Sequence, residues 1–250
     1  ADLCFIAKAI PGKGQTILGT QHIDGPGGKG SKQAIAAAKL NGSVNFITKI
    51  GKDKNGEMAL TIYNELGMNT ASIIQDEKYS TGVAGKIVKE KTGENAINIV
   101  PGAAGTLIND DIDRNLNFIE KAQIFLTQLE TPYDVTRYAL KKAKEKGLVT
   151  ILNPAPACEI EDDDFQLIDF FTPNETEAEF YLNKKIETEK DIKSASEQFL
   201  KKGIKNVVMT LGEKGCYFAN EKENFFINAF KLKEPVLDTT GAGDAFSGAL

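Results

Sequence analysis

The chain has 250 residues, of which 41% are hydrophobic and 26% are charged, and its formal net charge is −5 at pH 7. These values are normal for a globular protein with a full hydrophobic core, and they argue against broad nucleic-acid binding. No apolar run approaches the length of a membrane span and no signal sequence is visible, so we expect no membrane partner. Three widely spaced cysteines form neither a metal pattern nor a disulfide framework, which favours a reducing cytoplasm.

Strand-like apolar runs alternate with helical patterns along most of the chain. In chain order we predict a helix over 31–40, a strand over 44–50, a helix over 54–66, a strand over 122–129, a helix over 133–146, strands over 148–152 and 167–171, helices over 175–182 and 191–202, and a strand over 206–211. This alternation predicts an α/β fold with a mostly parallel central sheet and helices on both faces. Ligands of such sheets bind at the carboxyl ends of the strands.

Two regions, about 3–24 and 80–100, interrupt this alternation with short strands and glycine-containing turns. They predict a small separate β-sheet acting as a lid, and the alternative is a pair of edge hairpins. The chain also starts at Ala1 and stops at Leu250 inside a helical pattern. We therefore expect a single α/β domain over 1–250 that is truncated at both ends.

The most informative motif is Asp-Thr-Thr-Gly-Ala-Gly-Asp at residues 238–244, which precedes a run compatible with a helix. Glycine permits a tight turn that aims consecutive backbone N–H groups at one anion. Asp244 stands beside that turn, where it could take a proton from an attacking hydroxyl. An anion cradle next to a base is what phosphoryl transfer to an alcohol requires. The alternative is an ordinary helix N-cap.

A second glycine-rich stretch, residues 25–31, precedes an alanine-rich helical pattern. It formally satisfies the G-x-G-x-x-G dinucleotide pattern, but no acid placed for a ribose follows the next strand. It is not a P-loop either, because Gly30 is not followed by Lys-Ser or Lys-Thr. We interpret it as a backbone that lets a small polar ligand come close, with Lys29 as a charged donor; a purely structural turn is the alternative.

Polar residues follow several of the predicted strands. Asn153 begins Asn-Pro-Ala-Pro-Ala after the strand over 148–152, and Glu130 ends the strand over 122–129 as a plausible hydroxyl acceptor. Thr210 and Gly212 end the last strand, as a nucleotide-contacting loop would. The lone histidine, His22, lies in the predicted lid, has no partner visible in the sequence, and is interpreted as structural or solvent-facing.

Asn174 and Glu177 have two interpretations. Their spacing is that of a helix capping box, in which each side chain bonds the other residue's backbone N–H. In the functional alternative Asn174 touches a phosphate and Glu177 holds a metal-bound water.

Taken together, these motifs resemble the ribokinase-like family of carbohydrate kinases over almost the whole chain. The stretch Gly27-Gly28-Lys29-Gly30 matches the family's first signature and residues 238–244 match the second. The resemblance implies a ribokinase-like fold, ATP-dependent phosphorylation of ribose at its 5-hydroxyl, and a homodimer formed through the lid.

The resemblance also implies a role for individual residues. The base is Asp244, and the anion hole is formed by the amides of Gly241, Ala242 and Gly243. The sugar site comprises Asp2, Gly28, Lys29, Glu130 and Asp244, and the ATP site comprises Asn153, Asn174, Thr210 and Gly212. Glu177 would hold Mg²⁺ through water, and Asp238 would help bind K⁺.

One departure bears on the substrate. The family motif runs Gly-Gly-Lys-Gly-x-Asn-Gln, and Lys32 stands where the Asn touches sugar. A kinase of another sugar or sugar phosphate is therefore the nearest alternative. A non-catalytic sugar- or nucleotide-binding protein and a nicotinamide-dependent oxidoreductase are the others; the former leaves an intact Asp244 unexplained, and the latter leaves the whole 241–244 turn unexplained.

Overall fold

The structure is a computed structural model that describes residues 1–233, 236 and 239–250. The chain forms two compact units. The first comprises Ala1–Leu107 and Pro235–Leu250, and the second comprises Ile108–Glu234. The expectation that residues 1–250 form a single domain stays a prediction. None of the described helices is both long enough and apolar enough to cross a membrane.

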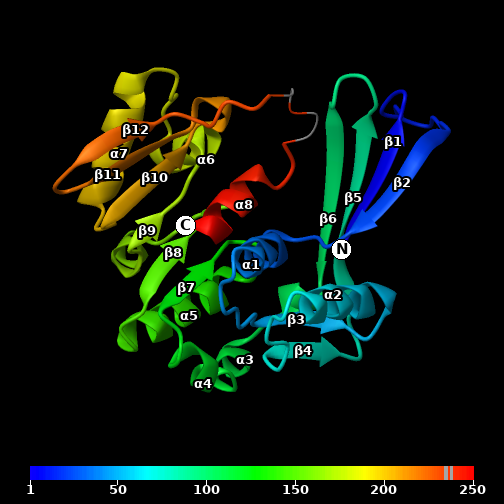
Figure 1. Ribbon diagram of the computed structural model, residues 1–250, viewed down its shortest axis with the longest axis horizontal. Coiled ribbons are helices and arrows are strands. Elements are labelled where there is room, and N and C mark those ends of the chain that lie inside the picture. The colour runs from blue at the N-terminus through cyan, green and yellow to red at the C-terminus, as the bar shows by residue number, and fades with distance from the viewer. Residues whose placement is uncertain (234–235, 237–238) are drawn as a thin grey trace. The chain divides into compact units, whose positions relative to one another are not determined.

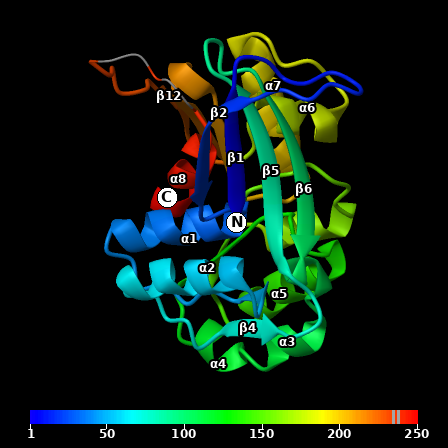
Figure 2. The same cartoon turned by 90° about the vertical axis from the view of Figure 1, so that its right-hand side faces the viewer.

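The first unit combines a small sheet with helices and a strand pair. Its elements are β1 (Asp2–Ala7), β2 (Gly19–Gly25), α1 (Lys29–Lys39), β3 (Thr48–Gly51), α2 (Lys54–Glu65), β4 (Ile73–Asp76), β5 (Thr81–Lys89), β6 (Asn95–Gly102), the 3-10 turn η1 (Ala103–Thr106) and α8 (Ala242–Ala249). The small sheet has the strand order β2-β1-β5-β6, with β1 parallel to β5 and the other pairs antiparallel (Figure 2). The predicted separate sheet is thus confirmed.

The register of the small sheet places two charged residues on one face. Asp2 lies opposite Ala84 in the pairing of β1 with β5, and Lys86 lies two residues further along β5. Because side chains alternate between the faces of a strand, Asp2 and Lys86 project from the same side of this sheet.

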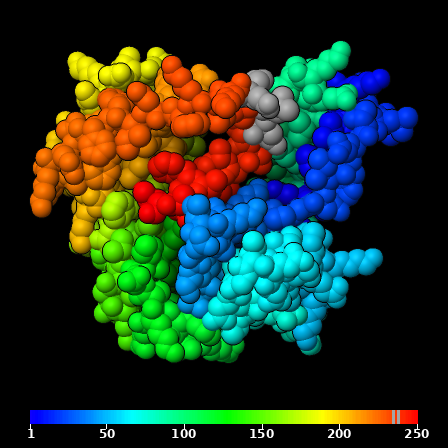
Figure 3. Space-filling model, viewed as in Figure 1, coloured from blue at the N-terminus to red at the C-terminus, as the bar shows by residue number. Residues whose placement is uncertain are grey.

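Helices α1 and α8 pack directly against each other in the first unit (Figures 1 and 3). A Cβ atom at Gly248 would lie 2.3 Å from the carbonyl oxygen of Gln33, so a side chain at Gly248 would force the helices apart. Small residues at a contact let two helix backbones approach closely. In this way the alanine-rich face of α1 and the glycine of α8 set the spacing between the two helices.

The second unit contains the large sheet. Its elements are α3 (Asn109–Asp113), α4 (Leu116–Ile119), β7 (Ile124–Thr127), α5 (Tyr133–Glu145), β8 (Val149–Leu152), η2 (Asp162–Leu167), β9 (Phe170–Phe171), α6 (Glu175–Leu182), α7 (Glu189–Lys201), β10 (Asn206–Thr210), η3 (Gly212–Lys214), β11 (Cys216–Asn220) and β12 (Asn224–Ile227). The six strands have the order β12-β11-β10-β9-β8-β7, and β7 to β10 are parallel while β11 and β12 add antiparallel edges. The expected mostly parallel sheet is present.

An aromatic cluster forms the core of the second unit. Phe171 of β9 is fully buried and contacts the rings of Phe165 and Phe199, with centroids 6.1 and 5.0 Å apart. Helix α7 brings Phe199 to this core by burying one face, at Ile192, Ala195, Ser196 and Phe199. Burial of large aromatic side chains supplies much of the stabilisation of a core. This packing fixes the strands whose carboxyl ends carry the predicted nucleotide residues.

Candidate functional site

Asp244 lies in the first turn of α8 and is only 7% exposed. The side-chain amide of Gln33, on α1, donates a hydrogen bond from Nε2 to Oδ1 of Asp244 at 3.0 Å. Gln33 is itself fully buried, with 0% exposure. The close packing of α1 and α8 therefore places a carboxylate and its amide donor together away from solvent.

Several groups tune the acidity of Asp244. Burial raises the pKa of Asp244 above its usual range, because a buried carboxylate loses the hydration of its charged form. The hydrogen bond from Gln33 and the positive charges of Lys29 and Lys32 lower that pKa, while the negative charge of Asp2 raises it. Burial outweighs the cations, so Asp244 is a stronger base than an exposed aspartate.

The turn before Asp244 has the backbone that the glycines of this motif predict. Gly241 is the N-cap of α8 and has φ 81°, a left-handed conformation that glycine adopts without strain. The amide of Ala242 donates to the carbonyl of Thr239 at 3.1 Å. Of the three predicted anion-hole amides, Ala242 therefore has an internal partner in this arrangement, and Gly241 and Gly243 are the better candidates.

The glycines of the first signature begin helix α1 and let the side chain of Asp2 lie close to the backbone. Gly28 is the N-cap of α1 with φ 83°, again left-handed. A Cβ at Gly27 would lie 2.3 Å from Oδ1 of Asp2, so only glycine leaves room for that carboxylate. We expected this backbone to admit a ligand; here the group that it admits is the side chain of Asp2.

Lys32 pairs with Asp2 in the same unit. Its ammonium Nζ lies 2.6 Å from Oδ2 of Asp2, and the two side chains are 24% and 23% exposed. The stem of Lys32 also passes Gly241, where a Cβ would lie 3.7 Å from Lys32 Cδ. Lys32 thus connects the predicted sugar carboxylate with the predicted anion turn.

Lys86 is a site residue that the sequence analysis missed. It is buried on β5, and its ammonium donates a hydrogen bond to Oγ1 of Thr240, directly before Gly241. The alternation along β5 could have placed Lys86 beside Asp2, but the contact with Thr240 spans 154 residues and has no local signature. The small sheet and the turn before α8 are therefore tied together by a charged hydrogen bond.

The predicted nucleotide residues gather in the second unit. Asn153 follows β8, Asn174 follows β9 and Thr210 ends β10, and these three strands are neighbours in the sheet. Asn174 and Thr210 form an isolated parallel bridge, and Nδ2 of Asn153 donates to the carbonyl of Thr172 at 2.9 Å. Because parallel strands end at the same edge, these residues lie together where ligands of α/β sheets bind.

Asn174 and Glu177 form the reciprocal capping box of α6. Oδ1 of Asn174 accepts from the Glu177 amide at 2.7 Å, and Oε2 of Glu177 accepts from the Asn174 amide at 2.9 Å. The structural interpretation of this pair is thus confirmed, and the contacts with phosphate and magnesium stay predictions. The capping hydrogen bond of Glu177 is compatible with the predicted contact to magnesium, because a carboxylate has more than one acceptor position.

The remaining predicted residues fall in different places. Gly212 opens the turn η3 with φ 56°, as a glycine-requiring loop after β10. Glu130 lies just after β7 in the second unit, whereas the other predicted sugar residues belong to the first. Asp238, the predicted potassium ligand, lies outside the described residues.

The carboxylate of Glu177 has donor chemistry that suits magnesium. Within the part of the chain that the structure describes, no group of three or more His, Cys, Asp or Glu side chains could hold a metal ion. Mg²⁺ commonly binds one or two carboxylates together with substrate phosphates and keeps several waters. The single carboxylate of Glu177 fits that mode.

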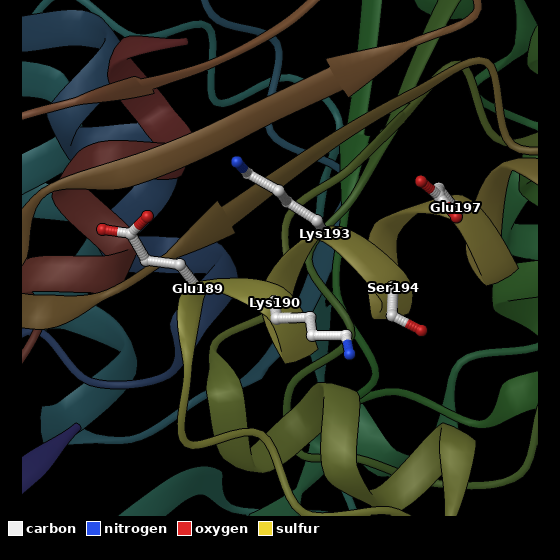
Figure 4. Close-up of a pocket in the computed structure, with 5 residues that line it drawn as sticks. All are labelled: Glu189, Lys190, Lys193, Ser194 and Glu197. Carbon is white, nitrogen blue, oxygen red and sulfur yellow. The ribbon is translucent and has the colours of Figure 1, made fainter.

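A surface hollow on α7 is unrelated to these residues. It is lined by Glu189, Lys190, Lys193, Ser194 and Glu197, all from one helix (Figure 4). The Nζ atom of Lys193 lies 5.6 Å from the ring centre of Phe226. Mixed charges on the solvated side of an amphipathic helix account for this hollow.

Comparison with known proteins covers both the sequence and the fold. The pfkB family of carbohydrate kinases matches residues 2–250. The chain is 38% identical to the ribokinase of Staphylococcus aureus over 241 residues, which are 96% of this chain and 78% of that protein. It is 35% identical to the deoxyribokinase of Salmonella typhi over 248 residues, 99% of this chain and 80% of that protein.

A third relative is a longer protein. The chain is 38% identical to the bifunctional ribokinase/ribose-5-phosphate isomerase A of Fructilactobacillus sanfranciscensis over 242 residues, 97% of this chain. It spans 44% of the length of that relative.

Solved structures share the fold. The ribokinase of Thermotoga maritima matches with a TM-score of 0.86 at 35% identity, over 99% of this chain and 80% of that one. The ribokinase of Arabidopsis thaliana complexed with ribose and ATP matches with a TM-score of 0.87 at 28% identity, with the same coverage of 99% and 80%. The fold is therefore ribokinase-like, as the sequence predicted.

Proposed function

Because the chain belongs to the pfkB family of carbohydrate kinases and is by that family an ATP-dependent sugar kinase, we propose that its acceptor is ribose and its product ribose 5-phosphate. The observation that carries the proposal is the buried carboxylate of Asp244 at the N-terminus of α8, beside Gly241. Ribokinase relatives at 36–38% identity support ribose as the acceptor.

The first unit supplies the base and the anion turn. Asp244 takes the proton of the 5-hydroxyl as that oxygen bonds to the γ-phosphorus and the bond to ADP breaks. The amides of Gly241 and Gly243, at the positive end of α8, receive the charge on the phosphoryl oxygens. The proton ends on Asp244 and the phosphoryl group on the sugar.

The second unit supplies the nucleotide-binding groups Asn153, Asn174, Thr210 and Gly212. Glu177 would hold Mg²⁺ through water, and that ion would neutralise charge on the ATP phosphates. Asp238 and a bound K⁺ would fix the turn before α8 without touching substrate. Glu130 would accept a hydrogen bond from a sugar hydroxyl.

A substrate panel tests the function. The purified protein with ATP and Mg²⁺ is expected to phosphorylate ribose with the highest kcat/KM among ribose, 2-deoxyribose, other pentoses and sugar phosphates. Absence of turnover with every sugar would contradict the kinase assignment of this chain. A higher kcat/KM for another acceptor would contradict the choice of ribose as the substrate but not the kinase assignment.

The second candidate is a kinase of a related sugar. Lys32 replaces the asparagine of the family motif and neutralises Asp2, which changes the hydrogen-bonding groups offered to the acceptor. The 35% identity to a deoxyribokinase supports 2-deoxyribose as the first alternative to test. A higher kcat/KM for 2-deoxyribose than for ribose would establish it.

We also infer a homodimer through the small sheet and a location in the cytoplasm. Exposed apolar side chains on that sheet support the first, and they are Phe5, Ile23, Ile97 and Ile99. Three cysteines without disulfides, Cys4, Cys158 and Cys216, support the second. Light scattering is expected to give a dimer for the wild type and a monomer for Ile99→Lys; a monomer for both would contradict the dimer.

A further inference from the structure

Gln33 is a fully buried polar side chain, and its amide donates a hydrogen bond to Asp244, the proposed base. Its Nε2 lies 3.0 Å from Oδ1 of Asp244, across 211 residues of sequence. A buried amide without partners is costly, and a hydrogen bond to a charged acceptor is about twice as strong as one between neutral groups. A glutamine at this point of an alanine-rich helix face is therefore stabilised by the contact that it makes.

We propose that Gln33 is a positioning residue for phosphoryl transfer: its amide fixes Oδ1 of Asp244 and thereby turns Oδ2 toward the acceptor hydroxyl. The proposal rests on the proposed function of Asp244. Among the residues that the structure describes, Oδ1 is the oxygen of Asp244 for which a hydrogen bond is found. Oδ2 is then the oxygen with an acceptor position for the proton of the substrate.

The packing of α1 against α8 makes this hydrogen bond possible. Gly248 lies one helical turn beyond Asp244 on the same face of α8, since i and i+4 residues are neighbours. A Cβ there would lie 2.3 Å from the carbonyl oxygen of Gln33 and 2.8 Å from the Cβ of Ala36. The missing side chain at Gly248 thus keeps Gln33 within reach of Asp244.

The electrostatic surroundings show why the donor matters. Asp244 faces Lys29 and Lys32 from α1 and Asp2 from β1, besides Gln33. Burial raises the pKa of Asp244, and the hydrogen bond from Gln33 is the largest of the effects that lower it. Loss of that bond would raise the pKa of Asp244 further, so the protonated carboxyl, which cannot act as a base, would persist to higher pH.

The experiment compares Gln33→Met with wild type and with Gln198→Met, the same change at an exposed position of α7. We expect Gln33→Met to lower kcat by about tenfold to a hundredfold at neutral pH, with KM for sugar and ATP little changed. The acid limb of the pH profile of kcat/KM should move up by about one pH unit or more. Gln198→Met should change neither.

Two further measurements separate positioning from folding and from the proposed function. A ¹³C NMR titration of the Asp244 carboxyl in the free protein needs no substrate, and its midpoint should rise in Gln33→Met. Gly248→Ala, which changes no polar group, should lower kcat in the same way, and the double variant should be far less impaired than additivity predicts.

Three results would overturn the proposal: an unchanged Asp244 titration in Gln33→Met, an unmoved acid limb, or fully additive effects of Gln33→Met and Gly248→Ala. If Gln33→Met does not fold, Gln33→Asn keeps an uncharged amide but shortens its reach to Asp244, and the same titration and acid limb decide. Failure of the wild type to phosphorylate any sugar would contradict the proposed function, while the titration would still report on Gln33.

Discussion

The ammonium group of Lys32 lies 2.6 Å from the carboxylate of Asp2. Asp2 is a predicted sugar ligand, and Lys32 occupies the position of a sugar-binding asparagine in the family motif. The cation is thus paired with a carboxylate, which is the arrangement required if the chain is to accept an uncharged sugar. Within this pair, the positive charge of Lys32 lowers the pKa of Asp244 and the negative charge of Asp2 raises it.

Lys32→Asn tests this arrangement. We expect KM for ribose to improve or to change by less than about fivefold, because a partly exposed ion pair contributes about 0–1 kcal/mol. Lys39→Asn, at the exposed end of α1, is the matched control. A rise in KM of about tenfold or more in Lys32→Asn alone would mean that Lys32 contacts the sugar by a charge-assisted hydrogen bond.

Asp244→Asn removes the base and keeps the shape. Sugar and ATP binding should remain nearly intact while kcat falls by about 10²–10⁴, the usual effect of a lost general base. Calorimetry would measure binding and a coupled assay for ADP would measure turnover. Near-wild-type turnover in Asp244→Asn would remove this residue from the mechanism.

Potassium should stimulate the activity more than sodium does. The resemblance to the family predicts that Asp238 helps to bind this cation, and a bound cation would hold the turn that carries Gly241. Initial rates in chloride salts of potassium, sodium and tetramethylammonium at equal ionic strength measure the effect. Equal rates in all three salts would contradict it.

Lys86→Met should slow catalysis without unfolding the small sheet. The ammonium of Lys86 bonds Thr240, and methionine keeps the apolar stem but loses the donor. A hydrogen bond to a charged group contributes about 1.5–3 kcal/mol of stabilisation. If losing it raises the free-energy barrier of the reaction by that amount, kcat should fall by about tenfold to a hundredfold. Lys89→Met, near the end of the same strand, is the control, and equal kinetics in both variants would contradict a role for Lys86.

Asp169 should stabilise the second unit in a pH-dependent way. Burial alone would raise the pKa of Asp169. The ammonium groups of Lys144 and Lys205, each 2.8 Å away, and the Thr150 amide outweigh burial and lower that pKa to about 2. A carboxyl with a pKa below its unfolded value of about 3.9 stabilises the fold above that value. This stabilisation is lost as the pH falls from about 4 to 2.

Asp169→Asn is expected to lower the free energy of unfolding by about 1–3 kcal/mol at neutral pH. The difference in Tm from wild type should shrink on acidification through the same range. Asp162→Asn removes an exposed partner of Lys202 and should cost little. A pH-independent difference in Tm would contradict the titration of Asp169.

Local patterns predicted most of the secondary structure. The helix over 175–182 was predicted at its observed bounds, since Asn174 and Glu177 cap it and signal its start. The strand over 167–171 was only partly right: β9 covers Phe170–Phe171, Leu167 ends the 3-10 turn η2, and Ile168 and Asp169 connect the two. A short apolar run does not show where such a turn gives way to a strand.

In the candidate site, too, the sequence predicted the residues that belong to local motifs and missed those whose partners are distant in the chain. Asp244 and the two glycine signatures were found because their turns depend on neighbours in sequence. Gln33 and Lys86 were missed because their partners lie 211 and 154 residues away. For these two residues the chemistry is specified by tertiary packing, and no pattern within one helix or strand reports it.

The first unit is made from two distant pieces of the chain, Ala1–Leu107 and Pro235–Leu250. During translation Gln33 emerges from the ribosome long before Asp244, with the whole of the second unit between them. The nascent first unit must therefore wait with the α8-contacting face of α1 uncovered, while Ile108–Glu234 can already collapse around its own aromatic core. Asp244 can dock against Gln33 only after both pieces of the first unit have been synthesised, so a chain that stalls before residue 244 would lack the group on which phosphoryl transfer depends.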